Sequence, residues 1–309
     1  MKLINQSFEV WTQPNPIIKM DKSLVQIHQE LIDAIYAQIE RAARICYKSK
    51  DKITPDSAKA FVERLISSQH YAMLEHGTVY LTLPLEKNSQ KQSEYNRMVI
   101  NKYMKNPYSR VYYRMDPRFS TVYITTNYRV IVENGWENDL EFLSSPTYEH
   151  PKRATVHFIT SRQIAMEILR QRVMSFAMES TRYCNYNKGK FGSELTCIIP
   201  EWTELKPGHY TWEESEDWNQ IQNADRYMLK QLLTAEYSYF HILEKGWKPQ
   251  QAAVVLPNDL KADLIVTGFV NDWAHVFALR VDGVTGAPHP MMKTLMAPVK
   301  EYFETNNIV

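Results

Sequence analysis

Stretches of β-branched and aromatic residues that alternate irregularly with segments of helical period most strongly limit how this chain can fold. Residues 75–85, 120–134 and 153–160 are rich in such residues, which favours three strands. Residues 24–45 carry apolar side chains at a spacing of three and four, which predicts an amphipathic helix. Because the elements do not alternate regularly and no internal repeat occurs, we expect an α+β fold with a mixed or antiparallel central sheet flanked by helices.

Further helices are expected on both sides of the third strand. One begins near Ser57, and another follows the third strand, where Thr160 or Ser161 can cap it. A long helix is expected over residues 222–245, ending before Gly246, because glycine suits the position after a helix. The last two predicted helices cover residues 258–280 and 290–305.

We expect residues 1–309 to form a single domain. At 44% hydrophobic residues the chain is apolar enough, and long enough, to build a large core. Residues 86–119 are polar and tyrosine-rich and have no clear period. We interpret them as an excursion at the sheet edge rather than as a separate domain.

Charge and composition argue against several classes of function. The chain has 36 Lys and Arg against 35 Asp and Glu, so no overall positive field draws it to nucleic acid or to a membrane. The N-terminal residues are polar, and we find no apolar run of membrane-spanning length. The 3 cysteines lack the spacing of a zinc site, so no metal is expected. We therefore expect a soluble protein of the cytoplasm whose anion sites are local.

Glycine is scarce, at 9 residues, and neither GxGxxG nor GxxxxGK[ST] occurs. Both motifs hold phosphates through backbone amides in a glycine-rich turn. A dinucleotide bound by this chain would have to be held by other groups.

Residues 170–186, RQRVMSFAMESTRYCNY, concentrate hydrogen-bond donors in one place. Glu167 lies three residues before Arg170, so on a helix both side chains share one face. Arginine donates two parallel hydrogen bonds and stays charged at any working pH, which suits it to phosphate. The alternative is a set of ordinary surface ion pairs, such as Glu179 with Arg182.

This segment resembles the signature of the flavin-dependent thymidylate synthases, RHRxxSxNExSxRY. Six positions match, namely Arg170, Arg172, Ser175, Ser180, Arg182 and Tyr183. Three positions depart: Gln171 stands for His, Ala177 for Asn, and Met178 for Glu, with Glu179 one residue later. The donors suited to phosphate are retained, but which side chain does the work of the carboxylate is left open.

The resemblance extends over most of the chain. Residues 73–83 are similar to an early strand of the family that contains a histidine, and residues 256–280 are similar to its C-terminal helix ending in Leu-Arg. Residues 285–290, TGAPHP, follow as in longer members of the family. The family usually has an arginine where this chain has Ala253. Either the affinity for the substrate phosphate is lower here, or a nearby cation such as Lys261 compensates.

The resemblance implies reductive methylation of dUMP to dTMP, without an enzyme nucleophile. Methylenetetrahydrofolate would supply the carbon and FAD reduced by NADPH the hydride, in a homotetramer with the flavin between subunits. Arg280 would be the catalytic cation, stabilising negative charge on the uracil ring. The implied dUMP contacts are Glu167, Arg170, Glu179, Ser180, Arg182 and Arg280. The implied FAD contacts are His76, Thr78, Arg170, Gln171, Arg172 and His275.

Other interpretations stay open at this point. Arg280 would otherwise be an arginine that interacts with the last carbonyls of its helix, and His76 and His275 hydrogen-bonded core histidines. Cys184 could serve as a nucleophile, although the Pro-Cys-His context of the cysteine-dependent synthases is absent. A related enzyme would modify another pyrimidine nucleotide. A nucleic-acid-binding module would use residues 108–114, YSRVYYR, as a stacking platform.

Overall fold

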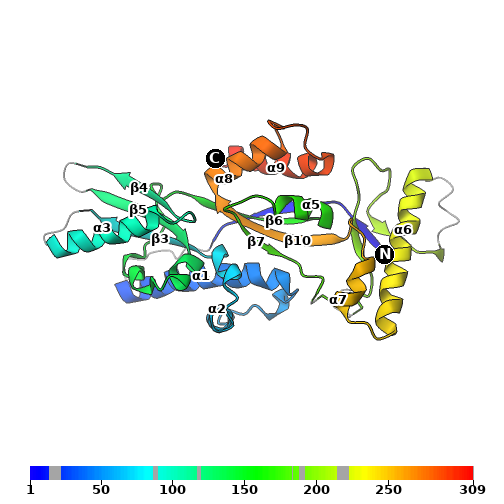
Figure 1. Ribbon diagram of the computed structural model, residues 1–309, viewed down its shortest axis with the longest axis horizontal. Helices are drawn as coiled ribbons and strands as arrows, with labels where there is room; N and C mark the ends of the chain where they lie inside the picture. Colours follow the sequence, from blue (N-terminus) through cyan, green and yellow to red (C-terminus); the bar gives the residue numbers. More distant parts are fainter. Residues whose placement is uncertain are drawn as a thin grey trace.

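A computed structural model describes residues 1–13, 22–85, 90–116, 120–182, 184–187, 192–213 and 223–308. A four-stranded antiparallel sheet in the order β2-β6-β10-β7 crosses the middle of the molecule (Figure 1). Its strands are Ser7–Trp11, Arg153–Ser161, Lys261–Phe269 and Ser175–Met178, in that order. Every residue of β10 except Lys261 is buried, so this strand is the interior of the fold.

Helices cover both faces of the central sheet (Figure 1). On one face lie α1 (Leu24–Cys46) and α2 (Ser57–Ser67), and on the other α5 (Arg162–Ile168), α8 (Val270–Arg280) and α9 (Pro290–Thr305). Successive residues of a strand point to opposite faces. Accordingly, Leu264 and Val266 of β10 pack with α5, α8 and α9, whereas Ile265 packs against α1. We call these two sides of β10 the α8 face and the α1 face.

A second antiparallel sheet, in the order β3-β5-β4, lies at one end of the molecule (Figure 1). It has a hydrophobic core of its own, to which Leu81, Ile124 and Tyr103 contribute. Within residues 86–119, the described part consists of helix α3 and strand β4, which is the edge of this sheet. The elements are β3 (Thr78–Pro84), α3 (Gln90–Met104), β4 (Arg110–Arg114), β5 (Thr121–Asn127), α4 (Tyr128–Glu133), and the short helices η1 (Lys50–Lys52), η2 (Tyr71–His76) and η3 (Glu137–Phe142).

The opposite end of the molecule holds the N-terminus and a small mixed sheet in the order β8-β1-β9 (Figure 1). The sheet is mixed because β1 pairs with β8 in parallel and with β9 in antiparallel. The long helix α6 packs against it through Leu229, Leu232 and Leu233. These elements are β1 (Lys2–Ile4), β8 (Thr196–Ile198), β9 (Gly208–His209), α6 (Asn223–Glu244), α7 (Pro249–Ala252) and η6 (Ala253–Val255).

The α+β class, with an antiparallel central sheet flanked by helices, is confirmed. The helices predicted over 24–45, from Ser57, over 222–245 and over 290–305 are present, and Ser161 caps α5 by accepting a hydrogen bond from the Ile164 N–H at 3.2 Å. Among the described residues, no helix combines the length and apolar character needed to cross a membrane.

Two element predictions were wrong in part. The strand predicted over 120–134 ends at Asn127, because the Asn127 side chain accepts a hydrogen bond from the Val130 N–H and starts helix α4 there. The helix predicted over 258–280 begins only at Val270, and residues 261–269 are strand β10. The run LIVTGF, rich in β-branched residues and buried on both faces, is typical of an interior strand.

Candidate functional site

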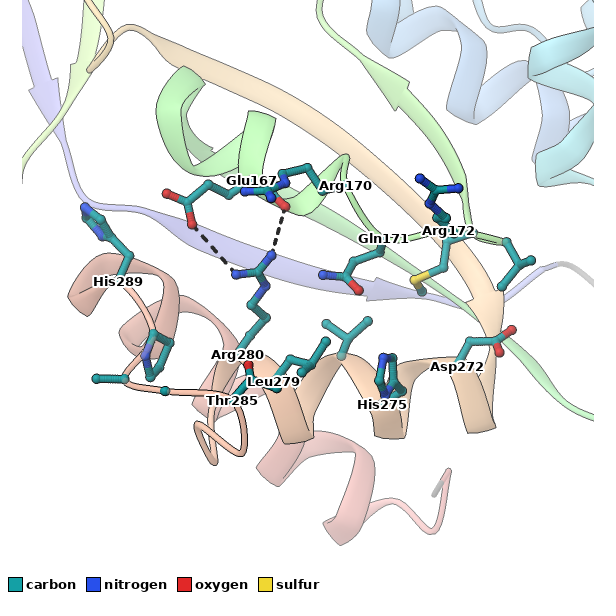
Figure 2. Close-up of a pocket in the computed structure, with 16 residues that line it drawn as sticks. Glu167, Arg170, Gln171, Arg172, Asp272, His275, Leu279, Arg280, Thr285 and His289 are labelled. Carbon is teal, nitrogen blue, oxygen red and sulfur yellow. Dashed lines mark hydrogen bonds and ion pairs between the residues drawn. The ribbon is translucent and has the colours of Figure 1, made fainter.

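A pocket of about 760 Å³ lies on the α8 face, between the end of α5, helix α8 and the loop 285–289 (Figure 2). The first part of the signature, residues 170–174, forms one wall, because it follows α5 closely. Helix α8 forms the facing wall. The pocket thus brings together six of the predicted site residues: Glu167, Arg170, Gln171, Arg172, His275 and Arg280.

Arg280, the last residue of α8, is held across the pocket by Glu167 of α5 and by Gln171 of the signature (Figure 2). Its Nη2 donates to the Glu167 carbonyl oxygen at 3.4 Å, and its Nη1 lies 3.9 Å from Glu167 Oε2. In the amide orientation that satisfies both groups, the Gln171 oxygen accepts from Arg280 Nε and Nη2 at 3.3 Å. Among the described residues, the guanidinium is therefore fixed by Glu167 of α5 and by Gln171 in the following turn rather than by the last carbonyls of its own helix, and its side chain remains 20% exposed.

The turn between α5 and β7 has a strained residue that the sequence did not indicate. Val173 has φ of 63°, a left-handed conformation that a β-branched residue rarely adopts. The next residue, Met174, is buried against Gly268 of β10, where an added Cβ would lie 2.5 Å from Met174 Cε. Met174 thus attaches the turn to the sheet, and both Met174 and Arg172 line the pocket.

Two further polar residues of the pocket were missed in the sequence. Asp272 Oδ2 and His289 Nδ1 are buried and, among the described residues, have no hydrogen-bond partner. The other carboxylate oxygen of Asp272 lies 3.6 Å from Arg110 Nη2. Asp272 precedes His275 by three positions on α8, a spacing that could have indicated it. Buried polar atoms without partners are costly, so both atoms suit contacts with a bound ligand.

His76 and Thr78, predicted to contact flavin, do not line this pocket but lie on the α1 face. His76 is fully buried, and its Nδ1 lies 2.8 Å from the hydroxyl of Thr267 on β10. Burial, together with the positive charge of Arg153, lowers the pKa of His76 to about 3, so the ring is neutral. The Thr78 hydroxyl accepts a hydrogen bond from Arg153 Nη1 at 3.1 Å.

Glu179 belongs to a buried group on the α1 face that we call the lysine–carboxylate cluster, formed by Lys48, His157, Glu179, Lys261 and Asp263. Glu179 Oε2 lies 2.8 Å from Lys261 Nζ and 3.1 Å from Lys48 Nζ. Asp263 pairs with both lysines and lies 2.6 Å from His157 Nε2. The sequence did not indicate Lys48, His157 or Asp263, because strand pairing brings His157 of β6 near Asp263 of β10, and Lys48 reaches them from the turn after α1.

The charges of this cluster are mutually balanced. Burial alone would raise the pKa of Asp263, but the hydrogen bond from His157 and the charges of Lys261 and Lys48 hold it well below the usual value. Burial would likewise lower the pKa of Lys261, yet Glu179 and Asp263 raise it. Lys261 is therefore engaged by two carboxylates, which argues against its replacing the arginine absent at Ala253.

Ser180 and Arg182 follow β7 in a turn outside the α8-face pocket. The Ser180 N–H donates to the Cys46 carbonyl at 3.2 Å, which ties the turn to the end of α1. Arg182 Nε donates to Gln250 Oε1 of α7 at 3.2 Å. Tyr183, the last match of the signature, lies outside the described residues.

The cysteines offer little support for a nucleophile. Cys184 is 1% exposed and packs with apolar residues such as Tyr239 and Leu260. Cys46 is also buried, and burial raises the pKa of its thiol to about 12. A thiol needs a lowered pKa and access to the substrate to attack it.

Comparison with known proteins agrees with the signature. Residues 141–289 match the model of the family described as thymidylate synthase complementing protein. A flavin-dependent thymidylate synthase from Synechocystis sp. is 29% identical over 140 residues, which span 44% of this chain and 60% of that relative.

Among solved structures, two of a UMP/dUMP methylase PolB from Streptomyces cacaoi are similar. The one bound with 5-Br UMP gives a TM-score of 0.42 at 13% identity, covering 99% of this chain and 92% of that one. The one bound with 5-Br dUMP gives 0.40 at 16% identity, covering 99% and 91%. These scores are too low to establish a shared fold. The match to the thymidylate synthase complementing protein family covers residues 141–289, just under half of the chain, and this part includes the signature and the whole α8-face pocket.

Proposed function

We propose that this protein is a flavin-dependent thymidylate synthase that methylates dUMP reductively to dTMP. Methylenetetrahydrofolate is the proposed carbon donor, and FAD reduced by NADPH the proposed hydride source. The observation that carries the proposal is the position of Arg280, fixed by Glu167 and Gln171 at one pocket with Arg170 and Arg172 of the signature. Similarity to a flavin-dependent synthase over 60% of its length supports it.

The residues of the α8-face pocket fit a flavin dinucleotide chemically. Arg170 and Arg172 offer the bidentate donors that a pyrophosphate requires in a chain without a glycine-rich loop. Asp272 and His289 add buried polar atoms without protein partners among the described residues, and His275 lies between Asp272 and Arg280 along the α8 wall of the pocket (Figure 2). When bound, the flavin supplies the hydride chemistry, and the protein supplies binding, orientation and electrostatics.

Arg280 is the group that we expect to act on the pyrimidine. Carbon C5 of uracil is a weak nucleophile, and a cation beside the ring stabilises the negative charge that develops at N3 and the carbonyl oxygens. The contacts with Glu167 and Gln171 hold the guanidinium in place before substrate binds. Such preorganisation avoids the cost of reorienting the cation during the reaction.

The predicted contacts lie in two places within one chain. Glu167, Arg170 and Arg280 are in the pocket, whereas Glu179, Ser180 and Arg182 lie at and after the end of β7. A homotetramer with flavin between subunits, as the family resemblance implies, would let one chain complete the site of another. We expect this assembly in the cytoplasm, and size-exclusion chromatography with light scattering tests the oligomer.

A second candidate function is modification of a different pyrimidine nucleotide. It is favoured by the engagement of Glu179 with Lys48 and Lys261, which leaves this carboxylate less able to contact a nucleotide. It is also favoured by Ala253 at the position of the family arginine. Product analysis with dUMP, UMP and dCMP in parallel separates the two functions.

The deciding experiment is to record the visible spectrum of the purified protein and then to reduce it anaerobically with NADPH. Adding dUMP and methylenetetrahydrofolate should restore oxidised-flavin bands at roughly 450 nm as dTMP forms. A flavin that is reduced without dTMP formation would favour the second function. A colourless protein that cannot be reconstituted with FAD would overturn both, and salt-sensitive oligonucleotide binding would then favour the nucleic-acid alternative.

A further inference from the structure

A second pocket, of about 570 Å³, lies between the end of α1, the short helix η1 and helix α2. These helices are on the opposite side of the central sheet from α8 and α9 (Figure 1). No residue lines both pockets. The lining contains four basic side chains and no acidic one: it consists of Arg44, Tyr47, Ser49, Lys52, Phe61, Arg64, Leu65, Ser68 and His70. We call this pocket the α1–α2 pocket.

Arg44 is the fixed cation of this pocket. The residue is only 7% exposed, and its Nε and Nη2 lie 2.7 and 2.6 Å from Glu40 Oε1. Glu40 is 1% exposed and accepts a further hydrogen bond from the Ser57 hydroxyl at 2.8 Å. A buried ion pair is weak evidence for stability, because desolvation offsets its attraction. Here the pair has a second consequence: it presents a guanidinium in a set orientation to the pocket.

Arg64 is positioned by the same aromatic ring as Arg44. The guanidinium carbon of Arg64 lies 5.2 Å from the Phe61 ring centroid, and that of Arg44 lies 4.6 Å from it. Arginine over an aromatic ring loses less freedom when it then donates hydrogen bonds, since its plane is already oriented. Two guanidinium groups are therefore preorganised on one buried ring.

The charges of the pocket leave an excess of two positive charges. Glu40 balances Arg44, whereas Arg64 and Lys52 form no ion pair with any described residue. Phe61 and Leu65, which are both buried, add apolar surface beside these cations. A phosphate monoester carries close to two negative charges at neutral pH, so its charge matches this excess.

We propose that the α1–α2 pocket binds a phosphate monoester carried on an apolar or aromatic body. The guanidinium groups of Arg44 and Arg64 and the ammonium of Lys52 take the phosphate. The hydroxyls of Ser49 and Ser68 add neutral donors, and the body packs against Phe61 and Leu65. This site goes beyond the proposed function, because no predicted contact of dUMP or FAD lines it.

The end of a helix offers a competing explanation for the basic residues. Arg44 lies in the last turn of α1 and Arg64 in the last turn of α2, where cations interact favourably with the helix dipole. In that role the two arginines would stabilise their helices and would not need to bind a ligand. That explanation does not account for Lys52, which lies outside both helices, or for the cavity itself.

The test is titration of the full-length protein with phenyl phosphate by isothermal calorimetry, with inorganic phosphate and phenol as comparison ligands. Arg64→Ala and Lys52→Ala remove pocket cations, and Lys59→Ala on α2 removes an exposed charge that does not line the pocket. Arg280→Ala reports on the α8-face pocket. Arg44→Ala is avoided, because it would leave Glu40 buried without its partner.

We expect saturable binding of phenyl phosphate, tighter than that of either comparison ligand. Binding should weaken at least tenfold in Arg64→Ala and Lys52→Ala and stay within twofold in Lys59→Ala and Arg280→Ala. Equal loss in Lys59→Ala would reduce the effect to general charge, and loss in Arg280→Ala would place the ligand in the other pocket. A lower melting temperature of Arg64→Ala without any change in binding would show a helix-end role and overturn the proposal, as would absence of saturable binding. Because Arg280→Ala reports separately, the two sites can fail independently.

Discussion

The two faces of strand β10 differ in how fully their charged and polar groups are paired with other protein groups. On the α8 face, Arg280 is held only by long contacts to Glu167 and Gln171, and buried atoms of Asp272 and His289 lack partners among the described residues. On the α1 face, Glu179 and Asp263 are each paired with two lysines. Binding sites need groups with capacity left for a ligand, whereas structural clusters use theirs internally. One continuous segment, the signature, contributes to both.

The largest expected effect concerns the α8 face. Arg280→Ala should lower the rate of dTMP formation by about 10²–10³-fold, the loss typical of removing one preorganised charge-stabilising donor. Flavin content, measured by absorbance, should change little, because the implied flavin contacts Arg170 and Arg172 remain. Arg114→Ala on the exposed strand β4 is the matched control. Loss of flavin from a folded Arg280→Ala protein would contradict the role assigned to this residue.

On the α1 face, the expected effect is on the stability of the fold. Asp263→Ala should lower the free energy of unfolding by about 3–5 kcal/mol, because it leaves Lys48, Lys261 and His157 partly uncompensated in the interior. Urea denaturation measures this. The control is Asp282→Ala, which breaks an exposed pair with Lys300 and should cost no more than about 1 kcal/mol. Similar losses in both variants would mean that the cluster is not a buried network in solution.

The buried His76 on the α1 face predicts that the free energy of unfolding depends on pH. Its pKa is about 3 in the folded protein against a reference value of 6.5, so the unfolded chain binds more protons between these values. The free energy of unfolding should therefore fall as pH decreases from 6.5 towards 4, and His76→Asn should flatten much of that slope. His150, whose pKa burial also lowers, leaves a residual slope. An unchanged slope in His76→Asn, with His209→Asn as the exposed control, would refute this account.

The smallest expected effect concerns the cap of helix α5, which carries Glu167 of the pocket. Ser161→Ala should destabilise the protein by about 1 kcal/mol, because the Ile164 N–H loses its acceptor at the start of α5. Ser161→Thr should retain most of that stability. Since α5 carries Glu167, we expect nucleotide affinity to change in Ser161→Ala. It should stay unchanged in Asn127→Ala, which removes the cap of α4 instead. Thermal denaturation and nucleotide titration of the three variants check both statements.

Local patterns predicted those parts of the fold that local physics decides. Amphipathic spacing indicated α1, Gly246 indicated where α6 ends, and the choice of Thr160 or Ser161 as a cap indicated where α5 begins. Strand β10 was not recognised from periodicity, because a strand buried on both faces has no alternation and its apolar run continues into α8. The change from strand to helix at Val270 depends on tertiary packing.

The candidate site was predictable in the same uneven way. The signature indicated the arginines and Glu167 because their spacing along the chain is fixed. It could not reveal that Glu179 faces away from the pocket, since that depends on the register of β7 against β10, in which Met178 pairs with Leu264. Likewise, Lys48 and Asp263 are 215 positions apart, and no local pattern connects them.

Gly268 lies against Met174, a residue that lines the α8-face pocket. A Cβ at this position would press on the terminal methyl of Met174, at 2.5 Å, rather than on backbone. Because methionine is unbranched and flexible, its side chain can move aside without unfolding the turn. Met174 lines the pocket and Gly268 does not, so a side chain at Gly268 would act on the pocket through Met174. Substitution of Gly268 is therefore expected to change the space in the pocket through Met174, without replacing Arg170, Arg172 or Arg280.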